Sequence, residues 1–231
     1  MRSTRDIHTL SAWIRILLPV VALALLIGCG RDPRAKKFAK ELKLLKNGTT
    51  EERADAILHI ADMGELAKDA LPYLIKALDD PESKVVVTAS TVLARIGEPS
   101  SEVASKLIEI IEKETDTKVV SSALNCLNVI GAKDDKKKVI VALMNNESGQ
   151  LRADAALSIF RLGADGVEFL PLLVQGIKDK DPNVRMYSSL ALGSLGSKAS
   201  SALPELNKLL DDEVDYVREE AQRAVQKIEG N

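Results

Sequence analysis

Few side chains in this chain could do chemistry. Its only histidines are His8 and His59, and its only cysteines are Cys29 and Cys126. An iron or zinc site needs several imidazole, thiolate or carboxylate ligands that converge on one metal, and two histidines cannot supply a histidine-based set. The sequence also lacks a glycine-rich phosphate loop and a Ser-His-Asp combination that would activate a nucleophile. We therefore expect no catalytic residue, no metal and no cofactor.

The remaining polar candidates have structural interpretations. Acidic pairs are frequent, but they fall in predicted turns between helices, where acidic residues ordinarily cap helices: Asp79-Asp80, Asp134-Asp135 and Asp211-Asp212-Glu213. His59 is interpreted as a packed or half-exposed side chain. Cys126 is interpreted as a buried thiol, because the sequence supplies no obvious basic neighbours that would make it reactive.

Cys29 ends a segment with the composition of a secretory leader. Arg2 and Arg5 lie in a polar start, and the apolar run 16–27 is shorter than the roughly 20 residues that fill a bilayer. The run ends in Leu26-Ile27-Gly28-Cys29, which resembles the lipobox of bacterial lipoproteins. The resemblance implies that Cys29 is lipidated and becomes the first residue of the mature chain, and several acyl chains on one residue anchor a protein stably. An uncleaved signal anchor with an incidental cysteine is the alternative.

The lipoprotein resemblance also suggests a location and a division of the chain. Gly30 is not the Asp that holds lipoproteins of enteric bacteria at the inner membrane, so we favour the outer membrane, facing the periplasm, over the inner membrane. The expected parts are a signal peptide at 1–28, a lipidated tether at 29–37 and a repeat domain at 38–230. Only Cys126 then remains, so no intramolecular disulfide is expected in the mature chain.

A repeat of 32 to 34 residues organises the rest of the sequence. A hydrophobic residue followed by glycine recurs at Gly64, Gly97, Gly131, Gly163 and Gly196. The residue eight positions before each glycine is small: Ala56, Ala89, Ala123, Ala155 and Ser188. The residue four positions before each glycine is aliphatic: Ile60, Leu93, Leu127, Ile159 and Leu192. This spacing places apolar residues on one face of a helix, which the glycine ends by adopting a left-handed conformation.

A second helix is predicted after each glycine. Three of these helices open with a proline, which suits the first helical turn, at Pro72, Pro171 and Pro204. Their shared apolar position is Leu45, Leu78, Ile111, Leu143, Ile177 and Leu210. Phe38–Lys46 is then a half-repeat cap at one end and Val217–Ile228 a cap at the other. The expected fold is an all-α solenoid of five helical hairpins between two caps, about twelve helices, because one hairpin cannot bury its apolar face alone.

One motif distinguishes this repeat from others of similar length. Asp181-Pro182-Asn183-Val184-Arg185 opens a predicted first helix, and a longer version runs from Asp212 to Arg218. Its arginine recurs at Arg53 and Arg152, whereas Val86 and Val120 replace it in the middle repeats. The motif resembles the short HEAT-like repeats of the phycobilin-lyase type, over Phe38–Gly230. The resemblance implies that this arginine and the preceding aspartate pair between adjacent repeats, so we interpret the recurring arginines and glycines as structural.

Enzymes occur among relatives with such repeats, but this chain departs from them. They include phycobilin lyases and a di-iron hydroxylase whose ligands are repeated His-Glu pairs, which this sequence lacks. We therefore predict a non-enzymatic scaffold for protein–protein interaction, anchored to a membrane by its N-terminal lipid. A lyase-type enzyme or enzyme accessory is the alternative, and a structural spacer is a third interpretation.

The charge distribution narrows the class of partner. The chain has 32 basic and 34 acidic residues. Three of the basic residues and one acidic residue lie in the leader, and seven basic and two acidic residues lie between Arg31 and Lys46. The remaining repeat body has 22 basic against 31 acidic residues, which disfavours nucleic-acid binding.

The outward positions of the predicted second helices form two columns of residues. One column contains Lys40, Tyr73, Lys106, Lys138, Leu172 and Glu205, and the other contains Lys43, Lys76, Glu109, Val141, Gln175 and Lys208, so the first halves of the columns are mostly basic. The candidate binding face is Lys40, Lys43, Tyr73, Lys76, Lys106 and Lys138, which would meet an acidic protein segment or anionic lipid headgroups; the alternative is an ordinary solvated surface.

The segment Arg31–Lys46 has two interpretations. Phe38, Leu42 and Leu45 form one apolar stripe surrounded by lysines, as in a helix that lies on a membrane. The same stripe matches the repeat register, so we favour a packed cap, and the two roles can coexist.

Overall fold

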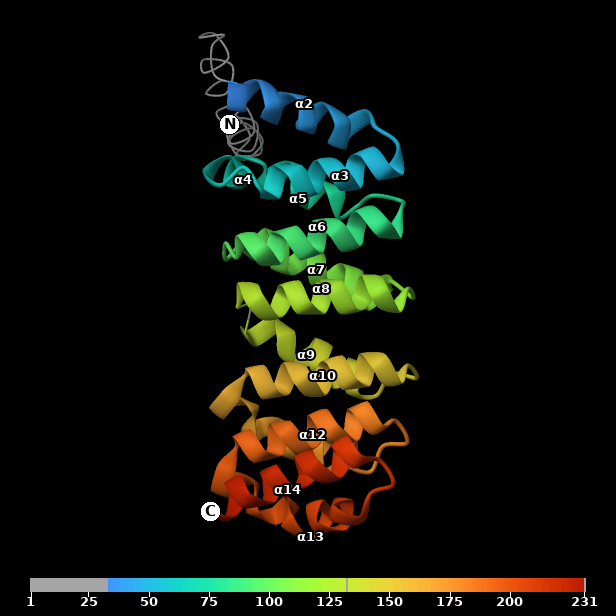
Figure 1. Ribbon diagram of the computed structural model, residues 1–231, viewed down its shortest axis with the longest axis vertical. Coiled ribbons are helices and arrows are strands. Elements are labelled where there is room, and N and C mark those ends of the chain that lie inside the picture. Colours follow the sequence, from blue (N-terminus) through green and yellow to red (C-terminus); the bar gives the residue numbers. More distant parts are fainter. Residues whose placement is uncertain (1–32, 132, 231) are drawn as a thin grey trace, which may run out of the picture. The chain divides into compact units, whose positions relative to one another are not determined.

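The computed structural model describes residues 33–131 and 133–230, which form helices and no strands (Figure 1). The predicted signal peptide and Cys29 lie outside the described residues. The chain divides into two compact units, an N-terminal unit that ends at Glu98 and a C-terminal unit that begins at Pro99. Among the described residues, no helix is long and apolar enough to cross a membrane.

The N-terminal unit is built from two layers of helices. Its helices are α2 (Pro33–Asn47), α3 (Thr50–Ala61), α4 (Glu65–Asp69), α5 (Leu71–Ala77) and α6 (Ser83–Ile96). Helix α3 packs between α2 and α6, and α5 contacts both α2 and α6 (Figure 1). First helices of the repeat therefore form one layer, α3 and α6, and second helices form the other, α2 and α5.

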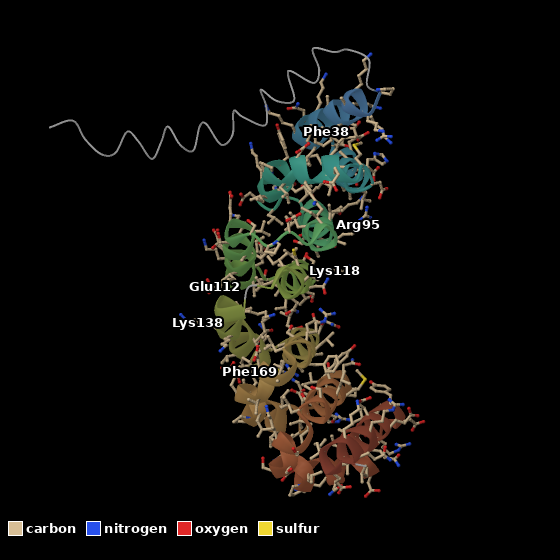
Figure 2. All side chains as sticks on the ribbon, turned by 90° about the vertical axis from the view of Figure 1, so that its left-hand side faces the viewer. Phe38, Arg95, Glu112, Lys118, Lys138 and Phe169 are labelled. Atoms are coloured by element: carbon tan, nitrogen blue, oxygen red, sulfur yellow. The ribbon has the colours of Figure 1, made fainter. Side chains whose placement is uncertain are left out.

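The C-terminal unit continues the same alternation. It contains α7 (Ser101–Lys113), α8 (Thr117–Ile130), α9 (Lys133–Met144), α10 (Gly149–Arg161), η1 (Gly163–Phe169), α11 (Leu170–Gly176), α12 (Pro182–Ser194), η2 (Gly196–Ala202), α13 (Leu203–Leu206), η3 (Asn207–Asp211) and α14 (Asp215–Glu229). The first helices α8, α10, α12 and α14 contact one another in that order, while α9 lies between α7 and α11. Figure 2 shows the two layers from the side, with Glu112 and Lys138 on the α7 and α9 side and Lys118 on the α8 side.

The predicted repeat architecture is confirmed, with three interrupted second helices. Among the described residues, one second helix, five successive pairs of a first and a second helix, and one first helix follow each other in sequence. Proline lies in the first turn of α5, α11 and α13, where its missing N–H costs no hydrogen bond. A separate short helix precedes each of them, α4, η1 or η2, so the second helix of these repeats is made of pieces.

The predicted apolar ladder of the first helices forms the core. The five residues at each of the two ladder positions, for example Ala56 and Ile60 in α3, are all buried. Gly193 shows how closely neighbouring helices approach, because a Cβ atom added there would lie 2.9 Å from the Cα atom of Ala224 in α14. Small residues are therefore needed on this face.

The predicted left-handed glycine is the C-cap residue of α6 and α8, but the prediction is wrong for α3, which ends at Ala61, because Gly64 has φ 63° and ψ −123° and lies outside the left-handed helical region. All five glycines have positive φ, and Gly97 ends α6 in the left-handed conformation, with φ 68° and ψ 13°. A side chain in that conformation would be strained, which is why glycine recurs there.

The ladder predicted for the second helices is wrong at its last position. Leu45, Leu78, Ile111, Leu143 and Ile177 are buried, but Leu210 is 38% exposed and its neighbour Leu209 is buried instead. Residues 207–211 form a 3₁₀-helix, whose three residues per turn shift the buried register relative to an α-helix.

The first cap starts earlier than predicted. Helix α2 begins at Pro33, five residues before the expected start at Phe38. Phe38 is 1% exposed and Leu45 is 8% exposed, so the apolar stripe of α2 packs inside the N-terminal unit. Leu42, the third residue of the predicted stripe, is half-buried. This packing matches the cap interpretation, because the two ends of the stripe are covered by the unit.

Candidate interaction face

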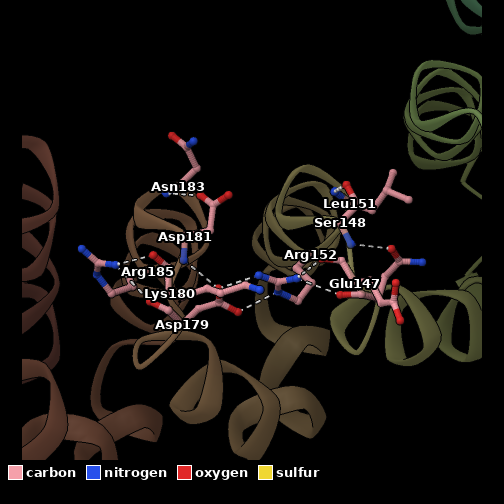
Figure 3. Close-up of polar contacts among 10 residues, drawn as sticks. Glu147, Ser148, Leu151, Arg152, Asp179, Lys180, Asp181, Asn183 and Arg185 are labelled. Carbon is pink, nitrogen blue, oxygen red and sulfur yellow. Dashed lines mark hydrogen bonds and ion pairs between the residues drawn. The ribbon is translucent and has the colours of Figure 1, made fainter.

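Three of the recurring arginines, Arg53, Arg152 and Arg185, connect the turns at one edge of each unit, whereas Arg218 bonds within its own turn, to Asp215 and to the carbonyl oxygen of Asp212. Arg152 donates hydrogen bonds from Nε and Nη2 to both carboxylate oxygens of Asp179, each at 2.7 Å, and from Nη1 to the carbonyl oxygens of Asn146 and Glu147 (Figure 3). Arg185 binds Asp212 in the same way at 2.8 Å, and Arg53 binds Asp80 at 2.7 Å. Each pair is separated by 27 residues. Each of these three arginines therefore ties the turn before its own helix to the turn before the next.

The aspartate partner differs from the one that the motif suggested in one repeat. Asp181, which precedes Arg185 in the motif, accepts a hydrogen bond from the N–H of Asn183 and caps α12 (Figure 3). Arg152 pairs instead with Asp179, two residues earlier, which also accepts a hydrogen bond from the N–H of Asp181. The two roles, capping and pairing, are divided between two carboxylates.

These pairs change the protonation equilibria of their members. Burial by itself raises the pKa of Asp179 and of Asp212, but hydrogen bonds from Arg152 and Arg185 and from backbone N–H groups outweigh it, and both pKa values are lowered. The hydrogen bond to Asp212 raises the pKa of Arg185. Both groups of each pair therefore remain charged, and their role is structural.

Two repeats lack both members of this pair. Val86 and Val120 stand at the arginine position and are buried, and the residues 27 positions later are Lys113 and Glu147 in place of aspartate. Loss of both members together avoids leaving one buried charge without its partner, which is the costly arrangement. The arginine ladder is therefore interrupted in the middle of the chain.

The histidine, the cysteine and the carboxylates offer no reactive cluster. His59 lies 3.3 Å from the carboxylate of buried Glu41 through its Nδ1 atom, and its side chain is 54% exposed. Burial raises the pKa of the Cys126 thiol to about 12, so thiolate is scarce at neutral pH. Within residues 33–131 and 133–230, no group of three His, Cys, Asp or Glu residues could hold a metal ion.

In the N-terminal unit, the residues of the candidate binding face lie on the second-helix layer. Lys40 and Lys43 are on α2 and Tyr73 and Lys76 are on α5, and these two helices contact each other. The three lysines are exposed and make no ion pair with any described residue, whereas Tyr73 is half-buried. This part of the face is therefore basic and accessible.

In the C-terminal unit, the candidate face has a different character. Lys106 is only 23% exposed at its side chain and forms an ion pair with Glu109 at 3.1 Å, so less positive charge is available there. Glu109 also pairs with Lys113, and these two lysines lower its pKa. Lys138 is exposed and makes no ion pair with the described residues.

A groove lies beside Lys138 that sequence reasoning did not identify. One hollow of about 520 Å³ is lined by Lys138, Val141, Ala142, Asn145, Phe169 and Leu172, among others. A second hollow of about 370 Å³ shares Asn145 and Leu172 with the first and continues to Gln175 and Lys180. Because the two hollows share these residues, we treat them as one feature, the α9–α11 groove. Four of the predicted outward positions line it: Lys138, Val141, Leu172 and Gln175.

The repeat pattern and this helical stacking agree with a known family. A model of HEAT repeats matches residues 39–128 and 137–226. The chain belongs to the HEAT-repeat family. No curated protein shows a significant sequence match to this HEAT-repeat chain.

Solved structures share the solenoid fold. An engineered protein is 22% identical, with 84% of this chain and 99% of the other covered and a TM-score of 0.64. A designed armadillo repeat protein in complex with the peptide (KR)4 is 18% identical, with 82% and 98% covered and a TM-score of 0.60. A further armadillo design, made for modular peptide recognition, is 19% identical, with 81% and 98% covered and a TM-score of 0.59. These similarities show a common fold, and the two armadillo designs are repeat proteins.

Proposed function

We propose that this HEAT-repeat protein is a non-enzymatic scaffold, held at a bacterial envelope membrane by a lipid on Cys29, that binds a protein segment in the α9–α11 groove. The groove carries the proposal, because it is a hollow lined by residues that the repeat register places outward on the second-helix layer. Solenoids commonly bind partners on an extended surface built from equivalent helices. The peptide-bound and peptide-directed armadillo designs use a similar fold for this purpose.

The chemistry of the groove favours an extended acidic segment with apolar side chains. Val141 is 42% exposed and, with Ala142 and Leu172, provides an apolar floor. Lys138 and Lys180 are exposed cations that make no ion pair with the described residues, whereas Glu168 is already paired with Lys137 at 2.9 Å. The unpaired charge along the groove is therefore positive, which complements carboxylates on the partner.

A site-specific photocrosslinking residue tests this groove. Placed at position 141, it should form an adduct with a partner in native membranes, and the crosslinked peptide should be acidic and contain apolar residues. The control is the same residue at position 129, because Val129 is 52% exposed but lies on α8, in the first-helix layer of the same unit. We expect Val141→Asp to weaken partner capture about tenfold, since it places a carboxylate on the apolar floor, and Val129→Asp to leave capture unchanged.

The groove assignment has a clear contrary outcome. Equal adducts at positions 141 and 129, or an adduct at 141 that maps to a basic segment, would show that the groove is not the binding site of an acidic partner. Equal capture by the two aspartate variants would lead to the same conclusion.

The anchor is tested separately by Cys29→Ala. If the lipobox directs lipidation and cleavage, this variant should keep its leader and lose the lipid mass. Wild-type protein should carry diacylglycerol on a new N-terminal cysteine, measured by mass spectrometry of protein purified from membranes. An unmodified Cys29 in the membrane-bound wild-type protein would refute the lipoprotein assignment while leaving the groove proposal intact.

A further inference from the structure

Five of the eight exposed residues of helix α2 are lysines. Lys36, Lys37, Lys40, Lys43 and Lys46 are all exposed, and none makes an ion pair with a residue that the structure describes. At 100° per residue, Lys36, Lys40 and Lys43 fall within an arc of about 60°. This arc faces away from Phe38 and Leu45, which are buried in the N-terminal unit. The packing of the cap therefore directs the lysines outward.

The one acidic side chain of α2 does not reduce this charge at the surface. Glu41 is 4% exposed and its carboxylate lies on the buried side of the helix, 3.3 Å from Nδ1 of His59. Helix α2 packs against α3 and α5. The outer side of α2 consequently carries positive charge that no neighbouring carboxylate of the described chain neutralises.

The position of α2 in the chain limits how far this charge can lie from the proposed lipid. Cys29 precedes Pro33, the first residue of α2, by four residues. An extended chain spans at most about 3.6 Å per residue, so the start of α2 is within about 15 Å of Cys29. An anionic membrane surface attracts basic residues over roughly a Debye length, about 8 Å at physiological salt.

We propose that the lysine face of α2 lies against anionic lipid headgroups and so orients the HEAT repeats on the membrane. The proposal rests on the lipid anchor of the proposed function and assigns to α2 a role beyond that of a cap. A bilayer fits this surface better than a protein ligand does, because the cations are spread along the outer side of one helix and lie close in sequence to the proposed anchor. Contact is electrostatic and peripheral, since Phe38 and Leu45 are already buried in the N-terminal unit.

Lysine footprinting of the intact lipoprotein tests this proposal. The protein is purified from membranes and reconstituted into vesicles of phosphatidylcholine alone, or of phosphatidylcholine with about one third phosphatidylglycerol. Labelling by an amine-reactive reagent at the five α2 lysines should slow at least about threefold in the anionic vesicles, and the effect should disappear at about 1 M salt, where the Debye length is near 3 Å. Lys198 and Lys227, exposed residues of the C-terminal unit, serve as internal controls.

A charge-reversal variant provides an independent measurement. Lys36→Glu, Lys40→Glu and Lys43→Glu together should remove the slowing at Lys37 and Lys46. A matched triple of Lys198→Glu, Lys208→Glu and Lys227→Glu should leave it unchanged. These side chains are exposed in the structure, so neither triple removes a core contact.

Two results would overturn the lipid proposal. Equal labelling rates in the two vesicle types would show that α2 does not bind anionic lipid, and slowing that occurs only in native membranes would indicate a protein ligand instead. Both results would be obtained with protein whose lipidation has been verified by mass, so they could not be explained by a missing lipid anchor. Neither experiment involves the α9–α11 groove, so the result for α2 is also independent of the groove proposal.

Discussion

Arg185→Ala is expected to lower the free energy of unfolding of the C-terminal unit by about 2 to 3 kcal/mol. Arg185 is 7% exposed and binds both carboxylate oxygens of Asp212 at 2.8 Å, and it also binds the carbonyl oxygens of Asp179 and Lys180. Removal of the guanidinium leaves Asp212 charged and without its main partner. Urea unfolding followed by circular dichroism measures the change.

Arg161→Ala is the matched control for this prediction. Arg161 also hydrogen-bonds across helices, from Nη1 to the side chain of Asn125 at 2.9 Å, but it is exposed. Its replacement should have a much smaller effect, because exposed polar contacts exchange readily with water. Equal losses for the two variants would contradict a special stabilising role of the Arg185–Asp212 pair.

A double variant distinguishes two contributions to the loss of stability: the loss of the ion pair itself, and the cost of leaving one buried charge without a partner. Arg185→Val combined with Asp212→Asn removes the charge from both partners; in the natural repeat that contains Val86, the arginine and the aspartate are likewise both replaced, by Val86 and the exposed Lys113. The double variant should be more stable than Arg185→Val alone, because an uncompensated buried carboxylate is the larger penalty. A double variant less stable than the single one would contradict this reasoning.

The same pairs predict how stability depends on pH. Asp179 and Asp212 have lowered pKa values in the folded protein, while an unfolded aspartate titrates near about 3.9. The folded state is therefore favoured by these groups above that pH, and the contribution is lost as pH falls from about 4 through the lower folded pKa. The stability difference between wild type and Arg185→Ala should shrink over this interval, as equilibrium unfolding at several pH values would show.

Phe38→Ala is expected to cost about 3 kcal/mol in the N-terminal unit. Phe38 is 1% exposed and is among the largest fully buried side chains, so its removal leaves a cavity between the cap and the neighbouring helices. Hydrogen exchange should rise first in α2 and α3, because this unit and the C-terminal unit are separately compact and open locally.

Leu58→Ala is the control for the cap. Leu58 lies on α3 in the same unit but is 44% exposed, so truncation should change hydrogen exchange little. If Phe38→Ala were as mild as Leu58→Ala, and instead weakened membrane association, α2 would be a membrane-lying helix rather than a packed cap.

Local patterns made the repeat predictable. A small residue and an aliphatic residue four positions apart mark one helical face, and the following glycine is needed because its backbone has a positive φ. Both signals depend on residues close in sequence, which is why Ala56 and Ile60 could be assigned to the core before the structure was known. The caps followed from the same register, as buried Phe38 shows.

Other features depend on which side chains the tertiary structure brings within a few ångströms. The motif suggested Asp181 as the partner of Arg152, but Asp179 stands in the same turn, and only the folded geometry assigns Asp179 to pairing and Asp181 to capping. The repeat register predicted Leu210 at the shared apolar position of the second helices, whereas a local 3₁₀-helix buries Leu209 instead.

The interaction face shows the same division between sequence and structure. The repeat register by itself determined that Lys138, Val141, Leu172 and Gln175 point outward from the second helices. Only the packing of α9 beside α11 decided that these residues line a groove, and only the side-chain geometry showed that Lys106 is paired with Glu109 while Lys138 is not. Periodicity encodes the direction of a side chain from its own helix, but a groove or an ion pair requires the position of a second element, which the period does not specify.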